Sequence, residues 1–397
     1  MSDVPLIYLI AGEPSGDLLG GRLMRALVAL TGGEVRFAGI GGPAMADAGL
    51  ASLFPIDELT VMGLFEVAPR IPRLLRRMRE TADAIRARRP AAVVTIDAPS
   101  FCAGVWRRLG PTDAKLIHYV APSVWAWRPG RAAKLARRID HLMTLLPFEP
   151  PYFERVGLPA TFVGHPVVES GAAEGKGPAF RQRHGIAPEA PLVCVLPGSR
   201  PGEVRRLVRP FGDAVARLAE RRRGLTVAVP TVSTVAAPVA DEVSAWPIRT
   251  ILLQDERDKF DAMAASDVAL AASGTVTLEL ALAGTPMVVA YRMNPITHRL
   301  VRAMVRIEHA ALVNILAGRE AVPELIQGKA TPARLAAALE RLIADPAARA
   351  AQRETFERIA ERLRADEAPS FCAARVVLET IGQGAMMAKA ANRQGDR

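Results

Sequence analysis

The sequence predicts an α/β protein built from two doubly wound, Rossmann-like domains, with additional helices at the C-terminal end. The first observation is that short apolar runs alternate with helical patterns along most of the chain. The second is that these runs lack period-two alternation, as expected for parallel strands that are buried on both faces. The third is the length, because 397 residues suffice for two domains that each have their own core.

Eleven strands are expected, most of them bounded by Gly, Pro or Asp. The first half of the chain supplies Leu6–Ala11, Arg36–Ile40, Ala92–Ile96, Lys115–Val120, His141–Leu146 and Thr161–Val163. The second half supplies Leu192–Leu196, Leu225–Val229, Arg249–Leu253, Val268–Ala271 and Met287–Ala290. From Thr331 onward the pattern is helical, over Pro332–Ala344, Pro346–Ala365 and Pro369–Ile381.

A glycine-rich, polar segment, Ser170–Pro178, separates the two strand-bearing halves and is expected to contain the domain boundary. We expect one domain over residues 1–170, a second over 171–365, a helix over 366–383 that packs back on the first domain, and a frayed tail over 384–397. Ligands of open α/β sheets bind outside the carboxyl ends of the strands, so the two domains are expected to face a cleft lined by those ends.

The net charge of +10 and the isoelectric point near 10.1 favour an anionic partner: nucleic acid, anionic lipid or a phosphorylated substrate. Nucleic acid is disfavoured because only 5% of the residues are aromatic and no stacking motif is present. The three cysteines lie far apart, which favours buried thiols, and the six histidines lack metal-ligand spacing, so no metal is expected. Neither a targeting peptide nor a membrane-spanning segment is expected.

Two segments in the second half predict phosphate-binding turns. Leu196-Pro-Gly-Ser-Arg200 follows one expected strand, and Ala272-Ser-Gly-Thr275 follows another. Each is a turn of small residues between a strand and a helix, where unpaired backbone N–H groups and the positive helix end face an anion. The residues expected to hold phosphate oxygens are Gly198, Ser199, Ser273, Gly274 and Thr275.

Two charged side chains extend this site to a nucleotide. Arg200 supplies a forked cation suited to phosphate oxygens, with a surface pair to Glu203 as the plainer alternative. Glu279 lies one helical turn after Thr275 among leucines; if it is not a solvated helix residue, its carboxylate suits the two hydroxyls of a sugar diol. Together they predict a nucleotide diphosphate site in a transferase, where Arg200 and helix ends rather than a metal balance the leaving-group charge.

The first half offers two turns that carry carboxylates. Asp97 ends an expected strand and either takes a proton from an acceptor hydroxyl or stabilises the turn before a proline. The first strand-to-helix turn contains Glu13, Ser15, Gly16 and Asp17. One of its polar residues is expected to cap a helix that begins at Leu18, while the loop as a whole could contact the acceptor or supply another base.

Nine segments of the chain resemble the lipid-A-disaccharide synthase family, in order and at the family's spacing, from about residue 6 to 380. They are Ala11–Asp17, Val61–Val67, Ile96–Pro99, His118–Arg128, Leu146–Glu149, Val163–His165, Leu196–Arg200, Ala272–Thr275 and Asn314–Arg319. The block that ends in Trp125-Ala-Trp-Arg128 is the most specific of them.

The resemblance implies a GT-B glycosyltransferase that joins UDP-2,3-diacylglucosamine to 2,3-diacylglucosamine 1-phosphate through a β(1→6) bond, with inversion and release of UDP. It implies no cofactor, and work on the cytoplasmic face of the Gram-negative inner membrane. The first domain then binds the acceptor and docks on the membrane, and the second binds the UDP-sugar. A homodimer is a further expectation, because family members can exchange C-terminal parts near the segment that matches Asn314–Arg319.

The resemblance also favours Asp97 as the base, with Asp17 and Glu13 as alternatives that it does not rank. The family often has Asp and Asn at the positions of Ser100 and Cys102, so a neighbouring carboxylate is missing here. The residues expected to bind the acceptor are Ser15, Gly16, Trp127 and Arg128, with Arg128 at the 1-phosphate. One of the two indoles, Trp125 or Trp127, is expected to pack at a domain interface instead.

The stretch Ile71–Arg79 is an amphipathic helical pattern with four arginines around an apolar stripe of Ile71, Leu74, Leu75 and Met78. An ordinary helix against its own core would look like this, and so would a helix on anionic lipid. The acylated substrate and the preceding apolar run favour membrane docking. The residues expected to take part are Met62, Leu64, Phe65, Arg73, Arg76 and Arg77.

Two other functions remain as alternatives. Another UDP-sugar enzyme of the same architecture, such as a UDP-N-acetylglucosamine epimerase or a peptidoglycan glycosyltransferase, would keep Arg200 and Glu279 but lack the Trp-Ala-Trp-Arg block. A nucleic-acid-binding protein would explain the charge alone.

Overall fold

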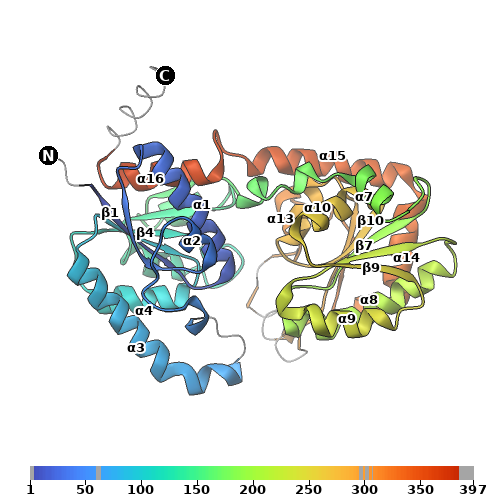
Figure 1. Ribbon diagram of the computed structural model, residues 1–397, viewed down its shortest axis with the longest axis horizontal. Helices are drawn as coiled ribbons and strands as arrows, with labels where there is room; N and C mark the ends of the chain where they lie inside the picture. Colours follow the sequence, from blue (N-terminus) through green and yellow to red (C-terminus); the bar gives the residue numbers. More distant parts are fainter. Residues whose placement is uncertain (1–3, 60–63, 295–297, 300–303, 306, 384–397) are drawn as a thin grey trace. The chain divides into compact units, whose positions relative to one another are not determined.

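The computed structural model describes residues 4–59, 64–294, 298–299, 304–305 and 307–383, without the side chains of 64–70. Over these residues the chain forms two six-stranded parallel sheets, one in each of two compact units (Figure 1). The first unit runs to Pro166 and resumes at Leu363, and the second covers Val167–Arg362.

The sheet of the first unit has the strand order β2-β1-β3-β4-β5-β6, and all its pairings are parallel. Its strands are β1 (Leu6–Ala11), β2 (Arg36–Ile40), β3 (Ala92–Ile96), β4 (Lys115–Tyr119), β5 (His141–Thr144) and β6 (Ala160–Phe162). The order reverses between β1 and β3, where Ala11 pairs with Ile96. A crevice opens at the carboxyl edge of a parallel sheet at such a reversal, because the two chain connections leave in opposite directions.

Helices cover both faces of this sheet, as the apolar runs predict (Figure 1). On β1, Ile7 and Leu9 face one core and Tyr8 and Ile10 face the other. The first core includes α1 (Pro14–Thr31), α2 (Pro43–Asp47) and α16 (Pro369–Thr380). The second includes α3 (Leu64–Arg88), α4 (Pro99–Leu109), α5 (Arg131–Ala136) and α6 (Pro150–Glu154).

The sheet of the second unit has the order β12-β11-β10-β7-β8-β9, again all parallel. Its strands are β7 (Leu192–Leu196), β8 (Thr226–Pro230), β9 (Arg249–Leu253), β10 (Val268–Ala272), β11 (Met287–Tyr291) and β12 (Glu324–Ile326). Here the order reverses between β7 and β10, which are the two strands whose ends carry the expected phosphate-binding turns.

The second unit also has helices on both faces. One core contains α8 (Pro201–Ala219), α9 (Ala236–Ser244) and α14 (Pro332–Ala344), and the other contains α7 (Gly177–Arg183) and α10 (Glu256–Ala265). Over the described residues, the other α-helices of this unit that the structure defines are α11 (Val276–Leu282), α13 (Leu312–Ala317) and α15 (Pro346–Leu363). The short 3-10 turns are η1 (Ile56–Glu58), η2 (Pro166–Glu169), η3 (Ala172–Glu174), η4 (Ser233–Val235) and η5 (Gln327–Lys329).

The predicted fold class is confirmed, and the eleven expected strands are present with ends shifted by at most two residues. The sequence analysis missed β12, a strand of three half-buried residues at the edge of the sheet. Such a strand has too short an apolar run to be recognised from its pattern.

The expected linker, Ser170–Pro178, lies inside the second unit. Its glycines mark close packing against α10, since a Cβ atom on Gly175 would lie 2.3 Å from the carbonyl oxygen of Phe260. The second unit starts at Val167, and α16 packs against α1 of the first unit. The expected frayed tail lies outside the described residues.

The buried histidine of β4 predicts a pH dependence of stability. Nδ1 of His118 lies 2.8 Å from Oγ1 of Thr95, the ring meets Trp106 edge-on, and burial lowers the pKa of His118 to about 4. A lowered pKa means that the unfolded chain binds this proton more readily, so stability is present above pH 6.5 and is lost as the pH falls through 6.5 toward 4. We expect this group to remove roughly 2 kcal/mol of unfolding free energy between pH 7 and pH 5.

Urea denaturation at a series of pH values measures this loss. The His118→Phe variant should show a shallower decline below pH 7 than the wild type, whatever its absolute stability. The decline should not vanish, because burial also lowers the pKa of His165 to about 4. Equal slopes for variant and wild type would contradict the prediction.

Candidate functional site

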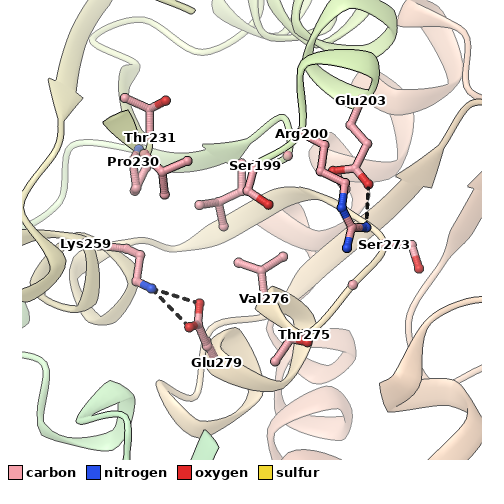
Figure 2. Close-up of a pocket in the computed structure, with 15 residues that line it drawn as sticks. Ser199, Arg200, Glu203, Pro230, Thr231, Lys259, Ser273, Thr275, Val276 and Glu279 are labelled. Atoms are coloured by element: carbon pink, nitrogen blue, oxygen red, sulfur yellow. Dashed lines mark hydrogen bonds and ion pairs between the residues drawn. The ribbon is translucent and has the colours of Figure 1, made fainter. Parts of the chain in front are cut away.

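A cavity of about 350 Å³ lies at the reversal point of the second unit, at the carboxyl ends of β7, β8 and β10 (Figure 2). Its lining comes from four segments: Leu196, Gly198, Ser199, Arg200 and Glu203; Pro230, Thr231 and Val232; Lys259; and Ala272, Ser273, Gly274, Thr275, Val276 and Glu279. All seven residues that the sequence predicts for a nucleotide-sugar site therefore meet in one pocket.

The turn after β7 depends on Gly198. Its φ of +114° lies in the region that favours glycine, and a Cβ atom would lie 2.7 Å from Oε2 of Glu203. Arg200 is the N-cap residue of α8, and its Nη1 lies 3.5 Å from Oε1 of Glu203. The surface pair considered as the alternative for Arg200 is thus present. It is long, and the Arg200 side chain is 61% exposed, so the pair leaves the guanidinium accessible to an anion.

The turn after β10 is held by side-chain hydrogen bonds. Oγ of Ser273 donates to the carbonyl of Ala310 at 3.0 Å, and Oγ1 of Thr277 donates to the carbonyl of Gly274 at 2.8 Å. Glu279 follows on α11 between the buried Leu278 and Leu280, and its own side chain is 17% exposed. The apolar setting that the sequence predicts for this carboxylate is therefore present.

Lys259 is a pocket residue that the sequence analysis missed. Its Nζ lies 3.0 Å and 3.2 Å from the two carboxylate oxygens of Glu279, and Figure 2 shows this pair on one side of the pocket with Arg200 and Glu203 on the other. One signal was available: the chain contains only six lysines against forty-five arginines, so a lysine in the first turns of a helix that follows a strand is unusual here. The end of β8 was also missed, because it carries no charged residue.

The Asn314 motif supports the turn after β10. Asn314 is fully buried, and its Nδ2 donates to Oε1 of Glu324 at 2.7 Å and to the carbonyl of Val322 at 2.9 Å. The Glu324 carboxylate accepts from the N–H groups of Ala310 and Ala311, each at 2.9 Å. Because the carbonyl of Ala310 receives the hydroxyl of Ser273, this network reaches the pocket. A subunit contact near Asn314 stays a prediction.

In the first unit, two of the expected turns meet at the reversal between β1 and β3. A Cβ atom on Gly12 would lie 2.5 Å from Cβ of Ala98, so the turn after β1 abuts the turn after β3. Asp97 and Ala98 have φ values of +51° and +46°, a conformation that costs free energy in residues with a side chain and is common at functional sites. Among the described residues no hydrogen-bond or ion-pair partner occupies the half-buried Asp97 carboxylate.

Asp17 has a different environment from Asp97. Helix α1 begins at Pro14, so the expected start at Leu18 is wrong, and Asp17 lies within the first turn. Its buried carboxylate accepts from the N–H groups of Gly42, Ala44 and Met45 at 2.7, 2.9 and 3.1 Å, so it caps α2 rather than α1.

The other residues of this turn differ in exposure. Glu13 is the half-buried N-cap residue of α1, and Ser15 is exposed. Gly16 packs against Ile96, the last residue of β3.

The two indoles after β4 have separate contacts. Nε1 of Trp125 donates to Oε1 of Glu149 at 3.0 Å, and its ring meets Phe148 edge-on, so Trp125 packs within its own unit. Two guanidinium groups instead lie over the ring of Trp127, those of Arg128 at 4.7 Å and Arg131 at 4.5 Å from a ring centroid. This arrangement forms a cationic surface next to a half-buried aromatic ring.

Glu149 fixes the position of the Trp125 side chain. It is buried, and besides Trp125 it accepts from the N–H groups of Leu145 and Leu146 at 3.2 and 3.0 Å. Burial raises the pKa of Glu149 to about 7, against the opposing effect of these hydrogen bonds.

The expected membrane-docking residues divide into two groups on α3. Arg73 and Arg77 both pair with Glu58, at 2.9 and 2.7 Å, and Arg77 holds the pKa of Glu58 at about 2. Arg76 is exposed and takes no part in this pairing.

The apolar stripe of α3 is also divided. Ile71 and Leu75 are 45% and 36% exposed, whereas Leu74 and Met78 pack against the core. Met62 and the side chains of Leu64 and Phe65 lie outside the described residues.

In the part of the chain that the structure describes, no group of three or more His, Cys, Asp or Glu side chains is placed to hold a metal ion. Over the same residues, none of the helices combines the length and the apolar character needed to cross a membrane.

Solved structures of similar fold define the class of this protein. UDP-GlcNAc 2-epimerase from Neisseria meningitidis, solved with UDP-GlcNAc, superposes with a TM-score of 0.59 at 12% identity, over 95% of this chain and 99% of that chain. Acinetobacter baumannii MurG gives a TM-score of 0.56 at 16% identity, over 94% of this chain and 99% of that chain. The fold is the GT-B type, with two Rossmann-like domains.

The family follows from the sequence. Residues 7–375 match the family model described as "Lipid-A-disaccharide synthetase". The chain is 55% identical to the lipid-A-disaccharide synthase of Rhodospirillum centenum, over 98% of this chain and 97% of that protein. It is 50% identical to the lipid-A-disaccharide synthase of Paramagnetospirillum magneticum, over 96% of this chain and 98% of that protein. The chain belongs to the lipid-A-disaccharide synthase family, as its motifs predict, and is a glycosyltransferase of lipid A biosynthesis.

The geometry of Gly198 predicts that Gly198→Ala impairs the pocket. The substitution strains the backbone at φ +114° and forces the Glu203 side chain away, so we expect UDP binding to weaken about tenfold or more, with roughly 1–2 kcal/mol lost in stability. Isothermal titration calorimetry and thermal unfolding measure the two effects.

Gly202→Ala is the matched control four residues later. Its Cβ atom would meet only the flexible end of Arg206, at 3.1 Å, in a helical conformation that alanine favours. Unchanged UDP affinity in Gly198→Ala would show that this turn does not hold the nucleotide.

Proposed function

We propose that this enzyme transfers 2,3-diacylglucosamine from its UDP conjugate to 2,3-diacylglucosamine 1-phosphate, forming a β(1→6)-linked tetraacyl disaccharide 1-phosphate and UDP. The observation that carries the proposal is the single pocket lined by Gly198, Ser199, Arg200, Ser273, Gly274, Thr275 and Glu279 in a member of this family. The names of the curated relatives supply the product class.

The proposed donor site is the pocket of the second unit. As the bond between the sugar and the diphosphate breaks, negative charge collects on the leaving group, and a cation fixed nearby stabilises it. Arg200 is the exposed cation in the pocket, and it stands at the N-terminus of the nineteen-residue α8, where the aligned peptide dipoles of the helix present positive charge. Glu279 would accept hydrogen bonds from the two ribose hydroxyls. Because Arg200 and this helix end supply positive charge, we propose that the reaction requires no metal ion or other cofactor.

The proposed base is Asp97. An attacking sugar hydroxyl has to lose its proton as it bonds to the anomeric carbon, and attack opposite the departing UDP inverts that centre. The Asp97 carboxylate lies at the reversal between β1 and β3, half-buried, with no partner among the described residues. The Asp17 carboxylate is occupied by three backbone donors, which makes it a positioning residue. Glu13 remains the second candidate.

The proposed acceptor site includes Trp127 and the guanidinium groups of Arg128 and Arg131. Two cations beside one ring suit the 1-phosphate of the acceptor, since arginine forks match phosphate oxygens. Ser15 and Gly16 lie in the first turn of α1, which follows β1, and would line the same edge of the sheet.

We propose that the protein associates peripherally with the cytoplasmic face of the inner membrane through α3. Among the described side chains of α3, Ile71 and Leu75 are the exposed large apolar residues, and Arg76 lies beside them as an exposed cation for anionic lipid. Arg73 and Arg77 contribute less to docking in this proposal because Glu58 already neutralises part of their charge. A homodimer is proposed from the family resemblance alone.

The reaction is tested with both substrates in detergent and EDTA, with mass spectrometry of the disaccharide. We expect wild type to form product and Asp97→Asn to lose about 10²–10⁴-fold in kcat, because it removes the base. Its affinity for UDP should stay within about threefold of wild type, since Asp97 is not among the residues that line the pocket.

Asp17→Asn distinguishes the structural role proposed for Asp17 from the catalytic role proposed for Asp97. It should lower the thermal midpoint through loss of the α2 cap, with a smaller effect on kcat. Full activity in Asp97→Asn would move the base to Glu13. Wild type that binds UDP but forms no disaccharide would favour another UDP-sugar reaction.

Membrane docking is tested by co-sedimentation with phosphatidylcholine vesicles, with and without phosphatidylglycerol. Ile71→Ser with Leu75→Ser should weaken binding to both vesicle types by about tenfold, because buried apolar area drives the insertion. Arg76→Glu should weaken binding only to anionic vesicles.

Arg25→Glu is the control, because Arg25 is an exposed arginine on α1, which covers the opposite face of the same sheet. If α3 variants and control sediment like the wild type, α3 is not the docking element.

A further inference from the structure

The pocket of the second unit contains an ion pair that the proposed reaction does not require. Nζ of Lys259 contacts both oxygens of Glu279, at 3.0 and 3.2 Å. The two side chains are only 21% and 17% exposed, so this pair is more shielded from water than that of Arg200 and Glu203. A shielded pair constrains the geometry of its members more than an exposed one does.

Contacts of neighbouring residues fix the position of Lys259 on helix α10. Helix α10 starts at the cap residue Asp255, whose carboxylate accepts from the N–H groups of Arg257 and Asp258. The next residue, Phe260, is buried, and Asp261 accepts from the N–H group of Lys176 at 2.6 Å. These contacts on both sides of Lys259 fix its place on the helix. Its ammonium also lies 4.4 Å from the centroid of the Phe260 ring, so its pairing with Glu279 is not its sole contact.

Glu279 is fixed equally well on α11, between two leucines that are fully buried. A carboxylate offers about four lone-pair positions, and Lys259 occupies one on each oxygen. One position on each oxygen is left, and these two suit the two neighbouring hydroxyls of a ribose. The lysine thereby holds the carboxylate in a single orientation.

We propose that Lys259 is a positioning residue that makes this pocket select a ribonucleoside diphosphate over its 2′-deoxy form. This rests on the proposed function, in which Glu279 accepts the ribose hydroxyls. With Lys259 present, both oxygens of Glu279 are oriented for both hydroxyls. Without it the carboxylate is free to turn, and a ligand with one hydroxyl binds nearly as well as a ligand with two.

Two other roles would have different consequences. If Lys259 contacts the diphosphate directly, its loss weakens the binding of UDP and of 2′-deoxy-UDP by the same factor. If the pair only tethers α10 to α11, its loss lowers the thermal midpoint and leaves the ratio of the two affinities unchanged. The ratio of affinities therefore separates positioning from both alternatives.

The experiment is calorimetric titration of the full chain with UDP and with 2′-deoxy-UDP. We expect wild type to prefer UDP by about tenfold, the size of one hydrogen bond to a charged group. Lys259→Met keeps an unbranched side chain one atom shorter and without the charge. It should weaken the binding of UDP by about tenfold but that of 2′-deoxy-UDP by less than about threefold. Lys259→Gln serves as a second variant if the methionine variant does not fold.

Two further variants complete the test. Glu256→Gln is the control on the same helix, because Glu256 is 70% exposed in its side chain and lies 3.8 Å from Lys259; it should leave both affinities unchanged. The double variant with Lys259→Met and Glu279→Gln should bind UDP no more weakly than Glu279→Gln alone, since the lysine acts through the carboxylate.

An equal loss for both nucleotides, or no loss for either, in the Lys259 variants would overturn this inference and leave the proposed function intact. An additive loss in the double variant would also overturn it. Wild type that fails to bind UDP would overturn the proposed function and this inference with it.

Discussion

In each unit a parallel sheet reverses its strand order once, and this reversal is the constraint on which both sites depend. Connections that leave in opposite directions expose the carboxyl ends of the two central strands, β1 and β3 in the first unit and β7 and β10 in the second. The turns after β7 and β10 line the pocket of the second unit, and Asp97 follows β3. Residues separated by about 80 positions along the chain become neighbours in this way.

The charged residues of the pocket differ in how strongly they are held. The Arg200 side chain is 61% exposed and pairs loosely with Glu203, so water screens that pair and a phosphate can compete for the guanidinium. The pair of Lys259 and Glu279 is shorter and more buried, so it holds the Glu279 carboxylate in place as a hydrogen-bond acceptor. One side of the pocket is thus suited to a mobile, highly charged group and the other to a neutral diol.

A second set of polar residues shapes the turns from behind. Asp17 caps α2, Glu149 holds the Trp125 loop, and Asn314 with Glu324 supports the segment that receives the hydroxyl of Ser273. Each is buried or partly buried and hydrogen-bonded, as the cost of an unpaired polar group requires. Asp17, Glu149 and Asn314 belong to motifs that resemble the family, so the motif residues of this protein include supports of a site as well as members of it.

The sequence by itself determined eleven of the strands, their parallel arrangement and the two small-residue turns after β7 and β10, because these depend on local apolar runs and on turn residues next to them. It also identified Asp97 and Glu279 as carboxylates in positions that suit chemistry. Only the tertiary structure decided which carboxylates are already occupied, since the donors to Asp17 lie 25 to 28 residues away and Lys259 lies 20 residues from Glu279. Contacts over such separations follow from how helices pack on a sheet, and no local pattern in the sequence records them.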